Sequence, residues 1–206
     1  MTSLSCSSTG DATNLANLIS AHVTSPSQVI YKSATLVSTF AGDACTFGQS
    51  NVNTGWASVR NLLSAKQITI HLIPAIFPNP STFPSLPWLD GELNWNSGWP
   101  TAGRDLDGSS DTLYMQDLGN KTYMPAISPC FFTYYGPNTY NKDWIYRSDD
   151  WLLAMRMEMI VAMRNKVDFA EIISWNGRSL SSIHPSIADN GANQTTGRAI
   201  TSARCE

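Results

Sequence analysis

The sequence predicts an α/β protein in which short, buried parallel strands alternate with helices. Three observations lead to this prediction. Short apolar runs with β-branched residues recur at a spacing of about 30 residues. Segments with apolar residues three and four positions apart lie between these runs. No glycine-rich phosphate-binding turn follows an early run, which favours a (β/α) barrel over a doubly wound nucleotide-binding fold.

The helices are predicted from their apolar periodicity and from the residues that end them. A first helix runs from Gly10 to Val23, and a second covers Val52–Ala65. The longest covers Asp149–Asn165, and we interpret its methionines as core packing. The acidic region 105–119 has room for a short helix. Its aspartates at 105, 107 and 111 are expected to be solvated, because the rest of a calcium-loop pattern is missing.

The strands are predicted where an apolar run ends in a polar turn. They are Leu36–Phe40, Ile68–Ile73, Leu89–Trp95, Thr122–Ile127 and Phe169–Ile173. Four prolines between residues 78 and 87 make that connection an extended loop with at most one helical turn. Because chemistry in such folds lies beyond the carboxyl ends of the strands, reacting or binding groups are expected there. Five strands cannot close an eight-stranded barrel, so the sequence predicts an incomplete barrel.

Composition excludes some functions and favours one kind of ligand. The 206 residues carry a net charge of −3 and no basic run, which argues against a nucleic-acid partner. No apolar run reaches the roughly 18 residues that span a bilayer, so no membrane partner is expected. Seven Trp, seven Tyr and seven Phe, with many Asn and Ser, suit a sugar ligand, although aromatic core packing is an equally good interpretation.

The sequence also indicates whether a metal or a cofactor is expected, but not in which compartment the protein works. No group of His, Cys and acidic residues has metal-ligand spacing, so neither a metal nor a cofactor is expected, and His71 is interpreted as a core residue. The polar segment Met1–Asp11 lacks the features of a signal peptide, which leaves the compartment open. Asn120 and Asn193 begin glycosylation sequons that matter if the chain is secreted.

Five segments, in order and in register from about residue 2 to residue 176, resemble glycoside hydrolase family 71, the fungal endo-α-1,3-glucanases or mutanases. The segments are Val37–Gly48, Leu89–Pro100, Tyr123–Thr133, Tyr140–Asp150 and Glu171–Asn176. The resemblance implies a secreted (β/α)8 barrel that hydrolyses α-1,3-glucan, a polysaccharide, with inversion and without a cofactor. It implies an extracellular or cell-wall location.

The resemblance also implies how this chain is organised. Residues 1–176 correspond to strands four to eight of the family barrel, so we expect an incomplete copy. Residues 177–206 depart from the family and form a tail for which weak order is expected. Cys6 and Cys45 follow consecutive family strands, and we predict that they form a disulfide in a secreted protein.

The family's catalytic pair has no counterpart here. After its last strand the family pattern reads Trp-Asn-Asp-Tyr-Gly-Glu-Ser, and its Asp and Glu resemble the acid pair of an inverting glycosidase. An ungapped match places Gly177 and Leu180 at these two positions, and a two-residue deletion places Arg178 at the Glu position. The catalytic residues are therefore unknown. A substitute pair, Asp90 with Glu92, is a minor alternative because strand alternation places Asp90, Glu92, Asn94 and Asn96 on one face.

The resemblance implies a set of substrate-binding residues at the strand ends, for which structural packing is the alternative. They are Asp90, Glu92, Trp95, Asn96, Trp99, Tyr134, Trp175 and Asn176. Three functions remain open at this point. The chain is a family-71 glucanase in incomplete form, a non-catalytic relative that binds α-1,3-glucan, or an inactive fragment.

Overall fold

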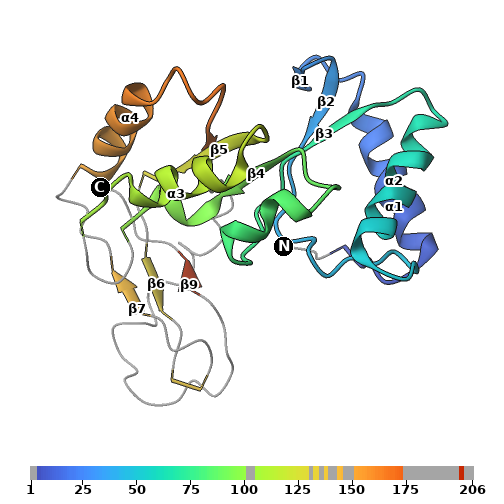
Figure 1. Ribbon diagram of the computed structural model, residues 1–206, viewed down its shortest axis with the longest axis horizontal. Coiled ribbons are helices and arrows are strands. Elements are labelled where there is room, and N and C mark those ends of the chain that lie inside the picture. Colours follow the sequence, from blue (N-terminus) through green and yellow to red (C-terminus); the bar gives the residue numbers. More distant parts are fainter. Residues whose placement is uncertain are drawn as a thin grey trace, which may run out of the picture. The chain divides into compact units, whose positions relative to one another are not determined.

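The computed structural model describes residues 4–100, 105–129, 132–134, 137–138, 143–145, 151–173 and 200–201 (Figure 1). The chain divides into two compact units. The first unit contains residues 1–94 and 113–124, and the second unit contains residues 95–112 and 125–206. Helix α3 (Ser109–Leu118) and strand β5 (Thr122–Ile127) contribute residues to both.

The sheet of the first unit begins with a hairpin that sequence reasoning missed. Strand β1 (Ile30–Tyr31) pairs antiparallel with β2 (Ala34–Val37). Lys32 and Ser33 between them have φ values of 48° and 62°, the left-handed conformation of a tight two-residue hairpin loop. Two-residue strands are too short to show an alternating pattern, which explains the omission.

The predicted parallel pairing is present. Strand β2 pairs parallel with β3 (Ile70–Leu72), and a further parallel bridge joins Phe40 to Ala75 beyond their ends. Strand β4 (Gly91–Asn94) lies next to β3, and the two are joined by a hydrogen bond of 3.1 Å from the Asp90 amide to the Leu72 carbonyl. On its other side, the Thr122 amide at the start of β5 donates to the Asp90 carbonyl at 2.9 Å.

Gly91 allows β4 to approach β5 this closely. A Cβ atom at this position would lie 2.3 Å from the Thr122 carbonyl oxygen, which is a severe clash. The strand ends at Asn94, where the chain turns into the 3-10 helix η2 (Trp95–Gly98). The predicted strand Leu89–Trp95 therefore begins two residues too early and ends one residue too late.

Helices α1 (Thr9–His22) and α2 (Val52–Ser64) pack against each other in the first unit (Figure 1). Both begin where a polar side chain caps free backbone amides. The Ser8 hydroxyl accepts from the Asp11 amide at 3.3 Å, and the Asn51 Oδ1 accepts from the Thr54 amide at 3.0 Å. A 3-10 helix, η1 (Pro80–Ser85), lies in the proline-rich connection before β4.

The second unit contains a parallel pair and an antiparallel sheet. The end of β5 pairs parallel with β8 (Glu171–Ile172). Strand β6 (Phe132–Tyr134) pairs antiparallel with both β7 (Asp143–Ile145) and β9 (Ile200–Thr201). These three antiparallel strands were not predicted. No helix among the described residues is long and apolar enough to cross a membrane.

Helix α4 (Leu152–Ala162) contradicts the packing predicted for its methionines. Leu152 and Arg156 are the buried side chains of the helix, whereas Met155 and Met157 are exposed. The solvated loop predicted for the acidic region is also wrong at Asp111, which is buried in α3. Asp111 forms a buried ion pair of 2.6 Å with Arg156, which lies on the same inward side of α4 as Leu152.

Candidate functional site

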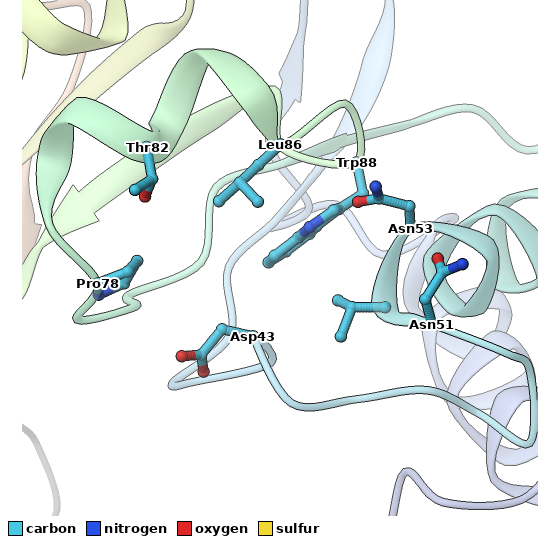
Figure 2. A pocket seen from close by; sticks show the side chains of 8 residues that line it. Asp43, Asn51, Asn53, Pro78, Thr82, Leu86 and Trp88 are labelled. Atoms are coloured by element: carbon cyan, nitrogen blue, oxygen red, sulfur yellow. The ribbon is translucent and has the colours of Figure 1, made fainter.

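A pocket of about 390 Å³ lies in the first unit, where the connections after β2 and β3 meet the start of α2. Figure 2 shows its lining, which combines apolar and polar side chains. The lining residues are Asp43, Asn51, Val52, Asn53, Pro78, Thr82, Leu86 and Trp88. The pocket therefore occupies the carboxyl ends of parallel strands, where α/β proteins bind their ligands.

Trp88 forms the aromatic wall of the pocket, and its indole ring stacks on that of Trp56. The two indole rings stack with centroids 5.3 Å apart and an interplanar angle of 5°. The Trp56 indole N–H donates to the Gly42 carbonyl at 3.0 Å, which holds it in place. The buried Trp88 indole N–H has no hydrogen-bond acceptor among the described residues.

Two polar side chains of the pocket are available to a ligand. Within the described part of the chain, neither the Asp43 carboxylate nor the Asn53 amide makes a side-chain hydrogen bond. Asn51 caps α2, and the Thr82 hydroxyl donates to the Asn79 carbonyl at 2.8 Å. A carboxylate and an amide beside an aromatic wall match the hydroxyls and the C–H face of a sugar.

Glu92 is a buried carboxyl on β4. Its exposed fraction is 0%, and its Oε1 accepts from the Ile76 amide at 2.7 Å. Its Oε2 has no partner among the described residues. Burial raises the pKa of Glu92 to about 9, and the negative charge of Asp43 adds to this shift. Glu92 is therefore a neutral acid at physiological pH.

Asp90 has a structural environment. Its Oδ2 accepts from the Arg60 guanidinium at 2.6 Å and from the Leu72 amide at 2.7 Å. Arg60 also donates to the carbonyls of Ile70 and Trp88. Asp90 thus joins α2 to β3 and β4, and its carboxylate is engaged by Arg60 and by the Leu72 amide.

The aromatic residues that follow β4 lie in the second unit. Trp95 and Asn96 are half-buried, and Trp99 is buried. The rings of Trp95 and Trp99 meet edge to face with centroids 6.2 Å apart. The sequence predicted that Asn96 lies on the same strand face as Glu92 and Asn94. This prediction is wrong, because the strand ends at Asn94 and Asn96 lies in the 3-10 helix η2.

Several predicted residues fall outside the described residues, so the structure does not test them. They are Trp175, Asn176, Gly177, Arg178, Leu180 and Asn193, and only the backbone of Tyr134 is described. His71 is half-buried, and its Nε2 lies 2.9 Å from the Thr122 hydroxyl. Asn120 is exposed in the turn after α3.

Cys6 and Cys45 form a disulfide, with Cα atoms 5.0 Å apart. The bond links the segment before α1 to the loop that carries Asp43. A backbone hydrogen bond of 2.8 Å from the Phe47 amide to the Cys6 carbonyl supports the same connection. The two segments are therefore joined covalently beside the pocket.

Sequence reasoning missed the pocket residues and two aromatic side chains beside it, Phe40 and Phe77. Both follow the ends of parallel strands, and this position could have identified them as candidate ligand-binding residues. The pocket itself was not visible because its residues come from three separate segments of the chain.

The profile of glycosyl hydrolase family 71 matches residues 2–198. The chain is 33% identical over 170 residues to a glucan endo-1,3-alpha-glucosidase of Schizosaccharomyces pombe, a match that covers 81% of this chain and 38% of that protein. It is 31% identical over 147 residues to an ascus wall endo-1,3-alpha-glucanase of the same organism, covering 68% of this chain and 32% of that protein.

A mutanase of Penicillium rubens is 31% identical to the chain over 177 residues, which are 81% of this chain and 35% of the mutanase. The matches thus span about a third of the length of each of these relatives. No solved structure matches the chain.

Proposed function

Because the chain belongs to glycosyl hydrolase family 71, we propose that its ligand is α-1,3-glucan and that it holds this polysaccharide at the carboxyl ends of its parallel strands. The observation that carries the proposal is the pocket lined by Trp88, Asp43 and Asn53. It offers an aromatic wall and two available polar groups, a combination suited to a neutral, hydroxyl-rich ligand.

We further propose that residues 1–176 are part of a (β/α)8 barrel. The parallel connections of β2 to β3, β3 to β4 and β5 to β8 support this architecture. The disulfide between Cys6 and Cys45 supports an extracellular or cell-wall location, because disulfides persist in oxidising compartments.

Hydrolysis by this chain is proposed to be negligible. An inverting glycosidase needs a protonated acid and a carboxylate roughly 6.5–9.5 Å apart. The positions that resemble the family's pair carry Gly177 with Leu180, or Arg178 in the alternative alignment. An arginine stays protonated and can serve as neither the acid nor the base.

One observation favours a second candidate, hydrolysis by Glu92 with Asp43. Glu92 is a neutral acid and Asp43 is a carboxylate of the pocket lining, which is the pairing of groups that inversion requires. However, Glu92 has no exposed surface, so a glycosidic oxygen cannot reach it in this conformation. Asp90 cannot replace it without breaking its ion pair with Arg60. The binding function is therefore preferred.

The experiment is co-sedimentation of the purified full chain with insoluble α-1,3-glucan, with insoluble β-1,3-glucan as the control. The proposal predicts depletion of the chain from solution by the α-linked polymer and little depletion by the β-linked polymer. Equal recovery in the supernatant with both polymers would overturn the proposed ligand.

A further inference from the structure

Phe40 and Phe77 form an exposed aromatic pair beside the pocket. Their side chains are 55% and 49% exposed, and their ring centroids lie 5.6 Å apart. Phe40 follows the end of β2, and Phe77 follows the end of β3. Both rings therefore lie at the edge of the sheet where the carboxyl ends of the parallel strands meet.

The backbone holds the two rings on the same face. Phe40 forms a parallel bridge with Ala75, and the Ala75 amide donates to the Thr39 carbonyl at 2.7 Å. Paired residues of neighbouring strands point to one face, and residues two apart in an extended chain share a face. Phe77, two residues beyond Ala75, consequently projects on the side of Phe40. The bridge between Phe40 and Ala75 therefore fixes the start of the segment that carries Phe77.

The residues of the aromatic pair lie close to pocket-lining residues along the chain. Asp43 lies three residues after Phe40, Pro78 directly follows Phe77, and both Asp43 and Pro78 line the pocket. Exposed apolar surface rimmed by polar residues is one mark of a ligand-binding groove. The ligand must present an apolar face to the rings and hydroxyls to the neighbouring carboxylate and amide.

We propose that Phe40 and Phe77 form a subsite that binds the C–H face of one glucosyl residue of α-1,3-glucan. The adjoining glucosyl residue reaches the pocket, where Asp43 and Asn53 pair with its hydroxyls. This inference rests on the proposed function and assigns a binding role to two residues outside the pocket lining.

The test compares the purified full chain with the double variant Phe40→Ala/Phe77→Ala. The probes are insoluble α-1,3-glucan in co-sedimentation and a soluble α-1,3-linked gluco-oligosaccharide in a fluorescence titration of the tryptophans. The double variant should bind about tenfold more weakly, since each aromatic contact contributes a few-fold in affinity. Phe77→Tyr, which keeps the ring, should bind within about twofold of the unmodified chain.

A matched control is Val29→Ala/Ile30→Ala. These side chains are 51% and 60% exposed, but they lie beside the amino-terminal part of β2, away from the strand ends that carry Phe40 and Phe77. The control should bind like the unmodified chain, and the thermal transitions of all variants should coincide.

The outcomes separate the two proposals. If the unmodified chain binds and the double variant binds equally well, the subsite is overturned while the proposed ligand stands. If the unmodified chain does not bind α-1,3-glucan, the proposed function fails, and the subsite fails with it. Weak binding by the double variant with normal binding by the control and by Phe77→Tyr supports the subsite.

Discussion

Arg156 of α4 and Asp111 of α3 form a fully buried, two-point ion pair. The guanidinium donates to the two carboxylate oxygens at 2.6 and 2.7 Å, and its Nε–H donates to the Ala126 carbonyl at 2.9 Å. Both side chains are excluded from solvent. The pair connects two helices and strand β5 within the second unit.

Asp111→Asn should destabilise the protein by about 3–5 kcal/mol, because it leaves the Arg156 charge buried without its counter-ion. Urea unfolding measures the change. Asp105→Asn, at an exposed carboxylate near the same helix, should change the free energy of unfolding by less than about 0.5 kcal/mol. Equal stabilities of the two variants would show that the ion pair does not support the fold.

Glu92 should make stability fall as the pH rises. Its pKa is about 9 in the folded protein, whereas that of an unperturbed Glu side chain is 4.5, so the folded state holds a proton that the unfolded state releases between these values. The contribution is fully present below about pH 4.5 and is lost on the way to about pH 9, on the order of several kcal/mol.

Glu92→Gln keeps an acceptor for the Ile76 amide and cannot ionise, so its free energy of unfolding should vary much less between pH 5 and pH 9. Urea unfolding at several pH values across this window provides the measurement. Glu158→Gln, at an exposed position of α4, should retain the slope of the unmodified protein. A slope that survives in Glu92→Gln would assign the pH dependence to another group.

Breaking the disulfide between Cys6 and Cys45 should destabilise the protein by about 4 kcal/mol, since the bond closes a loop with a sequence separation of 39. The thermal midpoint with and without a reducing agent measures this effect. The double variant Cys6→Ser/Cys45→Ser should match the reduced protein and should not respond to the reductant. Non-reducing peptide mapping that links Cys6 to a different cysteine would contradict the pairing.

The local elements could be predicted because periodicity is a local property. The apolar repeats of α1 and α2 and the compact run of β5 predicted helices and a strand close to those observed. Strand β1 has too few residues for an alternating pattern, and β9 pairs with β6 across more than 60 residues of sequence. Alternation also failed at Asn96, where a 3-10 helix replaces the strand.

The site was less predictable because it depends on contacts between distant residues. Arg156 and Asp111 are 45 residues apart, and neither position signals the other in the sequence. Asp90 and Glu92 lie two residues apart at β4, yet one is engaged by Arg60 and the other is a buried neutral acid. Side-chain chemistry was visible from the sequence, whereas the partner and the burial of each group were not.

We propose that this member of family 71 binds α-1,3-glucan but does not hydrolyse it at a useful rate. The most direct measurement is the release of reducing ends from insoluble α-1,3-glucan by the purified, unmodified chain. We expect release no greater than that of a buffer blank. Release well above the blank would show that the chain hydrolyses the polymer, and its loss in Glu92→Gln or Asp43→Asn would assign catalysis to those carboxyls.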